Sequence, residues 1–226
     1  MKNKKNTTPY VCNSVRTVGV IKPEFDPQSR NFLPPKLSVR GTGFWLKDQR
    51  AFVTCAHVLD GLIGGDINIT GLLVVGGNGI DYKNATISII DWSHDLAILS
   101  VVAEKDFLEK QIKNGLEVYD EKIDVGQKVS YAGFPFGNAL LNAKHTPTYA
   151  EGLVGSEILE DTTPKTIQIS GSVAGGYSGA PIVLLDNPQK VIAVLANSVS
   201  QQAGSANIFK GIHWKHIKEL FELVKS

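Results

Sequence analysis

The sequence predicts an all-β protein whose strands fall into two sets and whose chain ends in a helix. Short, β-branched segments bounded by Gly, Pro, Asn or Asp recur along most of the chain, a pattern typical of β-sandwiches and β-barrels. A charged interval at 103–124 lacks this pattern and divides the segments into two sets of similar size. Apolar residues at helical spacing near the C-terminus complete the prediction.

The expected strands can be placed in chain order. Six of them lie before the charged interval, at 14–21, 41–47, 51–56, 67–75, 85–91 and 96–102. The interval itself is polar and helix-capable, and five further strands follow it at 127–134, 151–159, 166–171, 180–185 and 190–196. Taken alone, the pattern is compatible with two barrels or with two sheets.

The final segment, "HWKHIKELFELVK", has the periodicity of an amphipathic helix. Its apolar residues fall on one face and its lysines and glutamates on the other, the apolar set being Trp214, Ile217, Leu220, Phe221 and Val224. The mixed charges argue against a helix lying on a membrane surface. We therefore expect it to dock on the β body.

Composition excludes several classes of protein. The 23 basic and 22 acidic residues give a net charge of +1, so there is no electrostatic case for a nucleic-acid or membrane partner. No apolar run has the length of a signal-peptide core or a transmembrane helix, and we expect a cytoplasmic protein. The two cysteines, Cys12 and Cys55, rule out a disulfide-rich scaffold. They allow one bridge or two free thiols, and the free form is the simpler expectation.

Three segments carry the residue types of nucleophilic catalysis. The segment "FVTCAHVL" places His57 at the end of an apolar strand, and "DWSHDLAIL" places Asp95 at the start of another. Ser178 follows in the glycine-rich turn "GGYSGAP". His57 and Asp95 belong to the first set of strands and Ser178 to the second, so a cleft between the two units would bring them together.

Each residue type suits a role in acyl transfer. An imidazole removes the serine proton and returns it to the leaving group, while a carboxylate fixes the imidazole tautomer. The turn can aim the backbone N–H groups of Gly176 and Ser178 at one point, which stabilises an oxyanion. Singly, such a His or Asp is more often structural, so the joint occurrence carries the prediction. This chemistry requires no cofactor and no metal. His213 and His216, three residues apart on the last helix, are interpreted as surface residues rather than metal ligands.

The motifs "TCAHV", "HDLAIL" and "GYSGAP" resemble the His, Asp and Ser motifs of the trypsin-like (chymotrypsin-fold) serine proteases. "GTGFWL" is similar to the strand before the histidine in bacterial HtrA-like members, and "GQKVSYAGFPFG" resembles the start of their second barrel. The resemblance implies His57 as general base and acid, Asp95 as its orienting group, Ser178 as nucleophile, and Gly176 with Ser178 as the oxyanion hole.

The resemblance also implies an architecture. It is a single peptidase domain over 1–226, made of two six-stranded antiparallel β-barrels and a C-terminal α-helix. The N-terminal barrel is expected at about 14–110, the linker at about 103–124, the C-terminal barrel at about 125–212 and the helix at about 213–225. The chain stops after this helix, so the sequence given leaves no room for the PDZ domains of HtrA proteins.

The chain departs from the digestive and clotting branch of the family at two positions. Tyr177 stands where an activating aspartate precedes the serine, and Val58 stands where secreted members carry a cysteine after the histidine. Both departures favour an intracellular or bacterial-type enzyme. We also expect the bulk of Tyr177 to turn Gly176 away from the oxyanion hole until substrate binds, which is a latent state known in this family.

Alignment to the family implies a neutral pocket for the residue before the scissile bond. Ser172 would lie near its floor; Ala196, Asn197 and Ser198 would form one wall, and Ala206 or Asn207 the other. None of these residues is charged, so a preference for small to medium uncharged residues is predicted.

The leading functional prediction is a serine endopeptidase that cuts protein or peptide substrates through an acyl-enzyme. The alternative is a catalytically latent or inactive protease-fold module that binds a peptide or a partner protein, and an activating partner protein stays open. An α/β-hydrolase esterase is rejected, because its triad follows the order Ser, Asp, His and its strands alternate with helices.

Overall fold

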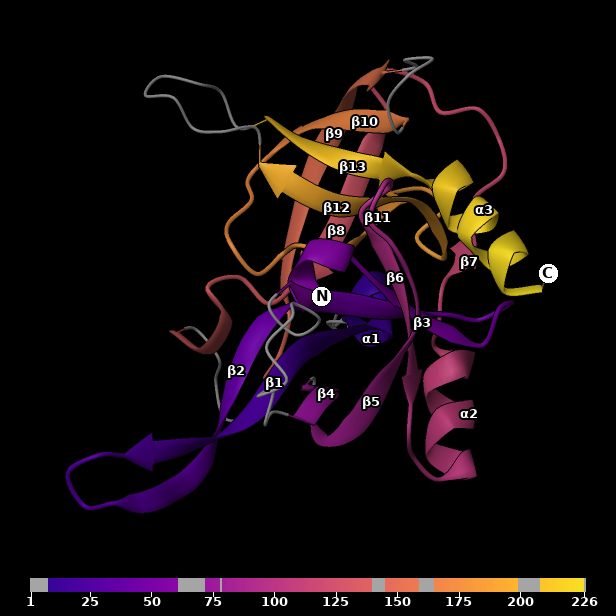
Figure 1. The fold of residues 1–226 in the computed structure, drawn as a ribbon. Coiled ribbons are helices and arrows are strands. Elements are labelled where there is room, and N and C mark those ends of the chain that lie inside the picture. The colour runs from indigo at the N-terminus through magenta and orange to yellow at the C-terminus, as the bar shows by residue number, and fades with distance from the viewer. Residues whose placement is uncertain are drawn as a thin grey trace, which may run out of the picture.

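The first set of strands closes into a barrel. The computed structural model describes residues 8–60, 72–77, 79–139, 145–158, 165–198 and 208–225. Six antiparallel strands run around the first barrel in the order β1-β2-β3-β6-β5-β4 (Figure 1). Their bounds are β1 Val15–Asp26, β2 Asn31–Leu46, β3 Ala51–Thr54, β4 Leu72–Gly77, β5 Ile80–Asp91 and β6 Leu96–Val101.

The second set closes in the same way. Its order is β11-β8-β9-β10-β13-β12, and pairing of β11 with β12 completes the barrel. The strands are β8 Lys128–Gly133, β9 Thr148–Ile158, β10 Thr166–Gly171, β11 Pro181–Leu184, β12 Lys190–Ser198 and β13 Ile208–His213. A short strand, β7 (Glu117–Val118), adds to β12 in parallel. The prediction of two six-stranded antiparallel barrels is confirmed.

Helices occupy the junction and the two ends of the described chain. They are α1 Tyr10–Ser14, α2 Lys105–Lys113 and α3 Trp214–Lys225, with 3₁₀ turns η1 Ala56–Leu59 and η2 Gly137–Ala139. The predicted terminal helix is confirmed as α3, and Ile217, Leu220 and Phe221 are buried as its periodicity requires. None of the described helices has the length and apolar character needed to span a membrane.

Two parts of the strand pattern differ from expectation. β1 and β2 extend into a long hairpin that projects from the barrel at the lower left of Figure 1. β13 was not among the strands expected from the sequence pattern, and its last residue, His213, was assigned to the helical segment. The polar interval folds as α2 followed by β7.

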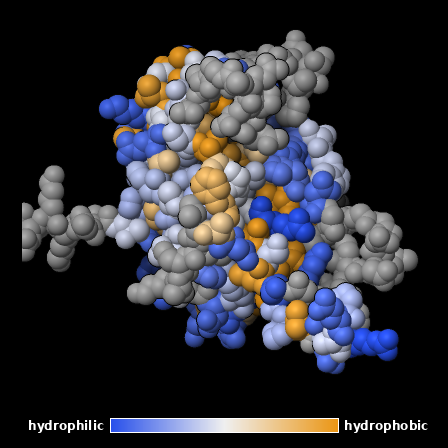
Figure 2. All heavy atoms as spheres, turned by 90° about the vertical axis from the view of Figure 1, so that its left-hand side faces the viewer, coloured by the Kyte–Doolittle hydropathy of each residue, from blue (hydrophilic) through white to orange (hydrophobic). Residues whose placement is uncertain are grey.

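The two barrels share apolar packing. One buried cluster joins the first barrel to Phe134 and Val194 of the second and to Ile217 of α3, and another fills the second barrel. Cys12 and Cys55 are buried and are not joined by a disulfide, as expected. On the face shown in Figure 2, apolar patches lie between hydrophilic side chains and form no uniform apolar surface. The shared core fixes one barrel against the other.

A buried cation connects the first barrel to α2. Arg16, which is 4% exposed, donates to the carbonyls of Asn13 (2.9 Å) and Val15 (2.5 Å) and to Oε1 of Gln111. Burial lowers the pKa of Arg16 to about 10, and no carboxylate among the described residues pairs with it. Among the described residues, the acceptors of this guanidinium are therefore all neutral oxygens, and its Nε has no acceptor there.

We expect Gln111→Leu to lower the free energy of unfolding by about 1–3 kcal/mol, because it leaves a buried charged donor without its acceptor. Urea denaturation measures the change. Lys110→Leu, at an exposed neighbouring position on α2, is the control and should change stability by less than about 0.5 kcal/mol. Equal effects of the two variants would contradict this role of Gln111.

Candidate active site

The turn between β5 and β6 places Asp95. The side chain of Asp91 accepts hydrogen bonds from the backbone N–H groups of Ser93 (2.9 Å) and His94 (3.2 Å), which closes an Asx-type turn. Asp95 then adopts φ +54°, a left-handed conformation that Asp tolerates better than most residues. The turn therefore presents the Asp95 carboxylate at the start of β6.

That carboxylate holds His57 by two contacts. Oδ1 of Asp95 accepts the backbone N–H of His57 at 2.8 Å, and Oδ2 lies 2.7 Å from His57 Nδ1. The backbone N–H of Ala56 donates to the Asp95 carbonyl at 3.1 Å. With Nδ1 donating to the carboxylate, Nε2 of His57 is the nitrogen left to accept a proton.

Cys55 lies two residues before His57. Burial raises the pKa of the Cys55 thiol well above its usual value, so the thiol stays protonated and is a poor metal ligand.

Glycines on both sides of Ser178 are required by packing. Gly176 has φ +102° and Gly179 has φ +86°. A Cβ at Gly176 would lie 2.2 Å from the Phe134 carbonyl oxygen, and a Cβ at Gly179 would lie 2.0 Å from that of Thr42. Both positions combine a left-handed backbone with close approach of another main chain, which glycine alone accommodates.

Thr42 of β2 joins this loop to the first barrel. Its backbone N–H donates to the Ser178 carbonyl at 2.8 Å, and its hydroxyl donates to the Gly176 carbonyl at 2.7 Å. The same hydroxyl accepts the N–H of Phe134 at 3.1 Å, and Thr54 donates to the Thr42 carbonyl at 2.7 Å. Thr42 is completely buried. It therefore fixes the serine loop against the strand that precedes His57.

Two backbone N–H groups of the loop have no acceptor among the described residues. The Gly175 carbonyl accepts the N–H of Phe136 at 2.5 Å, and in a trans peptide the N–H of Gly176 points the opposite way. Neither Gly176 N nor Ser178 N donates to an acceptor among the described residues.

Tyr177 is 4% exposed, packs edge-on to Tyr131 and lies inside the second barrel. The Tyr177 side chain therefore fills the barrel interior, and the expectation that its bulk turns Gly176 away stays a prediction.

The serine hydroxyl itself points to β12. Ser178 Oγ donates to the Ala196 carbonyl at 3.1 Å, and within the described part of the chain no hydrogen bond joins it to His57. The two residues nevertheless line one hollow of about 610 Å³, together with Arg40, Val58, Asp60, Gly175 and Gly176. The structure thus brings His57, Asp95 and Ser178 together at the junction of the barrels, with the serine turned aside.

The predicted specificity pocket is described in part. Ser172 is exposed, and its carbonyl accepts the Tyr131 hydroxyl at 2.8 Å. Ala196 is buried on β12, which continues through Asn197 and Ser198. The side chains of Asn197 and Ser198, and all of Ala206 and Asn207, lie outside the described residues. The neutral pocket stays a prediction.

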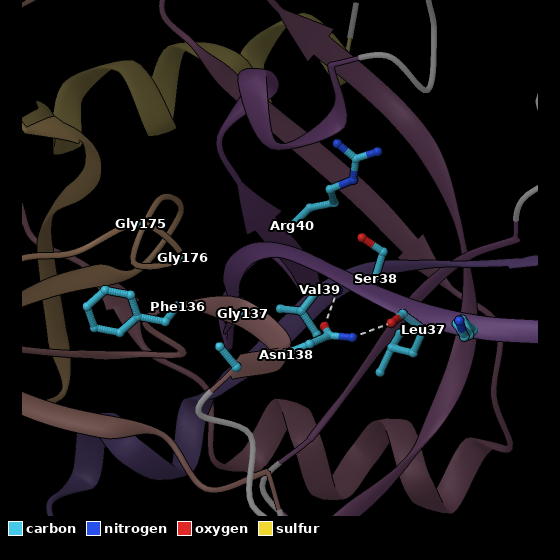
Figure 3. A pocket seen from close by; sticks show the side chains of 11 residues that line it. Leu37, Ser38, Val39, Arg40, Phe136, Gly137, Asn138, Gly175 and Gly176 are labelled. Atoms are coloured by element: carbon cyan, nitrogen blue, oxygen red, sulfur yellow. Dashed lines mark hydrogen bonds between the residues drawn. The ribbon is translucent and has the colours of Figure 1, made fainter.

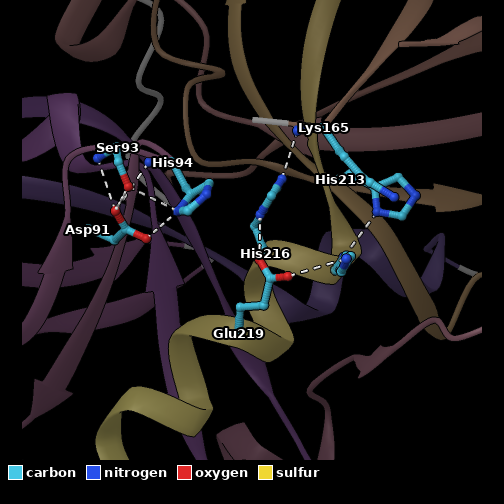
Figure 4. Close-up of polar contacts among 8 residues, drawn as sticks. Asp91, Ser93, His94, Lys165, His213, His216 and Glu219 are labelled. Carbon is cyan, nitrogen blue, oxygen red and sulfur yellow. Dashed lines mark hydrogen bonds and ion pairs between the residues drawn. The ribbon is translucent and has the colours of Figure 1, made fainter. Parts of the chain in front are cut away.

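Sequence reasoning missed a polar cluster beside the Asp95 turn (Figure 4). His216 of α3 stacks on His94, with ring centroids 4.1 Å apart, and its Nδ1 lies 2.7 Å from Glu219 Oε2. His213 and His216 are 4% and 6% exposed. Their interpretation as surface residues was wrong, because this face of α3 packs on the barrels. The signal available was Glu219, one turn after His216.

The cluster docks α3 rather than binding a metal. His94, His216 and Glu219 offer ligand atoms within 4.8 Å of one another. However, His216 Nε2 accepts the backbone N–H of Lys165 at 2.7 Å, so Nδ1 carries the proton that it donates to Glu219. A cation at Nδ1 would have to displace that proton onto a nitrogen already facing a donor. We therefore interpret the stack as a contact that holds α3 against the Asp95 turn.

Comparisons with known proteins identify the family. The model of the trypsin-like peptidase domain matches residues 41–194, which is more than half of the chain. The chain belongs to this family. No curated protein matches the sequence.

Solved structures of low sequence identity share the fold. An HtrA-type protease, AlgW with a decapeptide, has a TM-score of 0.72 at 16% identity, with 96% of this chain and 68% of that chain covered. The active form of the Rv3671c protease from M. tuberculosis has a TM-score of 0.64 at 20% identity, covering 94% and 81% of the two chains. A serine-to-alanine mutant of Rv3671c, in an inactive form, has a TM-score of 0.63 at 19% identity, covering 95% and 88%.

Stability should fall in acid because His213 is buried in its neutral form. Burial lowers the pKa of His213 to about 4 from an ordinary value of 6.5. The unfolded state therefore binds a proton that the folded state does not, and the free energy of unfolding decreases as pH falls from about 6.5 to about 4. The loss attributable to His213 is of order 2–3 kcal/mol. Urea denaturation at several pH values should show a shallower decline for His213→Gln, which cannot be protonated; an unchanged slope would contradict the assignment.

Proposed function

We propose that the protein is a serine endopeptidase that hydrolyses peptide bonds in proteins or peptides through an acyl-enzyme. The observation that carries this proposal is that Ser178 and His57, the latter held by Asp95, line one hollow between the barrels. The backbone N–H groups of Gly176 and Ser178 also have no acceptor among the described residues. Membership of the trypsin-like peptidase family supports it. Neutral residues at Ser172 and Ala196 support the proposed preference for uncharged side chains before the scissile bond.

The proposed mechanism assigns defined roles to Ser178, His57, Asp95 and Gly176. Ser178 rotates about its Cα–Cβ bond from the Ala196 carbonyl towards His57, which accepts its proton as the oxygen attacks the substrate carbonyl. The N–H groups of Gly176 and Ser178 stabilise the oxyanion. His57 then protonates the leaving amine, while Asp95 orients the imidazole and stabilises its charge. A water molecule, deprotonated by His57, then attacks the acyl-enzyme, and His57 returns the proton to Ser178 Oγ as the ester bond breaks.

The resting position of the Ser178 hydroxyl supports a second candidate function. With the hydroxyl bonded to Ala196 and not to His57, the protein would bind a peptide or a partner protein in the cleft without cutting it. In this view turnover is absent, or it begins after a partner protein reorganises the site. Replacement of Ser178 separates the candidates, because a binding module keeps its function as Ser178→Ala.

A fluorophosphonate probe, followed by intact mass, tests for an assembled site without knowledge of the substrate. We expect one adduct on the wild type and none on Ser178→Ala. The probe is applied at several pH values between about 5 and 9. Absence of labelling at every pH would favour the binding module.

The orienting role of Asp95 predicts a large kinetic effect with little structural change. Asp95→Asn keeps an acceptor for the His57 backbone but stabilises the wrong tautomer of the ring, so the labelling rate should fall by about 10⁴-fold. Circular dichroism and urea denaturation check that the fold is retained. A fall of less than about tenfold in a folded variant would remove Asp95 from the mechanism.

A further inference from the structure

We propose that Arg40 selects peptides with an acidic residue on the leaving-group side of the scissile bond, at the second position after it. This inference rests on the proposed peptidase function and adds a substrate class to it. The inference is drawn from the positive charge of Arg40 and from its position between the hollow that His57 and Ser178 line and a neighbouring groove.

The leaving segment lies on the His57 side of Ser178. His57 gives its proton to the departing amine, so the residues after the scissile bond start in the hollow that His57 lines with Val58, Gly176 and Ser178. The opposite side of Ser178 faces β12, where its hydroxyl contacts Ala196. The hollow of about 610 Å³ therefore holds the first leaving residue.

A second groove continues from this hollow. It has a volume of about 650 Å³ and is lined by residues 36–40 of β2, by 136–139, and by Gly175 and Gly176 (Figure 3). The hollow and the groove share Arg40, Gly175 and Gly176. Arg40 thus lies at the border between the hollow and the groove. The second residue after the scissile bond would bind at this border.

The backbone fixes Arg40 at this border. Val18 pairs with Gly41 and Gly19 with Val39, so Arg40 is the extra residue of a β-bulge, a device that redirects a side chain. On one side, a Cβ at Gly41 would lie 2.8 Å from the Ser178 carbonyl oxygen, which shows how closely β2 passes the serine. On the other side, Asn138 accepts the N–H of Val39 at 2.8 Å and donates to the Leu37 carbonyl (Figure 3).

The charges of the groove favour an acidic ligand. Arg40 is exposed and makes no hydrogen bond or ion pair with another described residue. Among the described residues that line the groove, the charged ones are Lys36 and Arg40, and both are basic. Asp60 lines the hollow but not the groove, which places the acidic preference at the second leaving residue rather than the first. A guanidinium pairs with a carboxylate through two parallel hydrogen bonds, and for an exposed pair the gain corresponds to about two- to fivefold.

Transfer of an acyl group to an added amine tests only the part of the site that binds the leaving segment. p-Nitrophenyl acetate acetylates Ser178 and releases p-nitrophenol; a peptide amine then competes with water for the acetyl group. The amine forms an amide bond as the ester bond to Ser178 Oγ breaks, and its proton passes through His57 to the serine oxygen. The acceptors are Gly-Xaa-Gly-amides in which Xaa is Asp, Asn or Lys, and the readout is the ratio of acetylated peptide to acetate.

The wild type should transfer the acetyl group to the Asp acceptor about two- to fivefold better than to the Asn acceptor. Arg40→Gln should abolish this difference, and Arg40→Glu should favour the Lys acceptor. Arg30→Gln removes the same charge from the exposed β1–β2 turn and should keep the wild-type ratio. Raising the salt from about 20 mM to about 500 mM should weaken the preference, because the pair is exposed.

Two failures are distinguishable. If p-nitrophenol is released at the same rate by the wild type and by Ser178→Ala, no acyl-enzyme forms, and the peptidase function and the role of Arg40 are both overturned. If acetylation depends on Ser178 but the Asp and Asn acceptors compete equally, the peptidase function stands and the role of Arg40 is overturned.

Discussion

The hydrogen bonds of Thr42, a buried residue of β2, are the contacts on which the rest of the site depends. Its backbone N–H, hydroxyl and carbonyl together bind the Ser178 carbonyl, the Gly176 carbonyl, the Phe134 N–H and the Thr54 hydroxyl. These partners come from both barrels, so one residue sets the distance between the strand that leads to His57 and the loop that carries the serine. Buried polar groups that are fully paired hold one geometry strongly, because each lost partner leaves a costly unsatisfied group.

A second polar contact acts from the opposite side. The Asp91 turn gives Asp95 its left-handed backbone, and the His94–His216 stack holds that turn against α3. Asp91 and His216, which help to orient Asp95 and His57 in this way, lie outside the three motifs that resemble the family. The arrangement also explains why two histidines are buried beside the site: each serves as a neutral acceptor for a backbone N–H, from Lys165 in one case and from Lys215 in the other.

The strands and the candidate catalytic residues could be predicted because both leave local signals in the sequence, whereas the closure of the strands into two barrels was implied by the resemblance to the family. Alternating apolar segments mark strands wherever they occur, and the glycines around Ser178 mark a backbone that other residues cannot adopt. Features created by contacts between distant segments left no such signal. The pairing of β13 with β10 and β12, the acceptance of Arg16 by Gln111 and the burial of His213 all join residues far apart in the chain. The position of the Ser178 hydroxyl is a rotamer, which sequence does not encode.

The apolar cluster that spans both barrels also affects the order in which parts of the chain fold. Val11 and Cys12, near the start of the chain, lie in the same cluster as Ile217 and Leu220, near its end. Contacts between such distant segments form late, because the loop between them must close first. On the ribosome, the N-terminal barrel emerges with its histidine and aspartate long before the serine loop and α3 are made. The cleft therefore forms only after the serine loop has been made, because residues of both barrels line it.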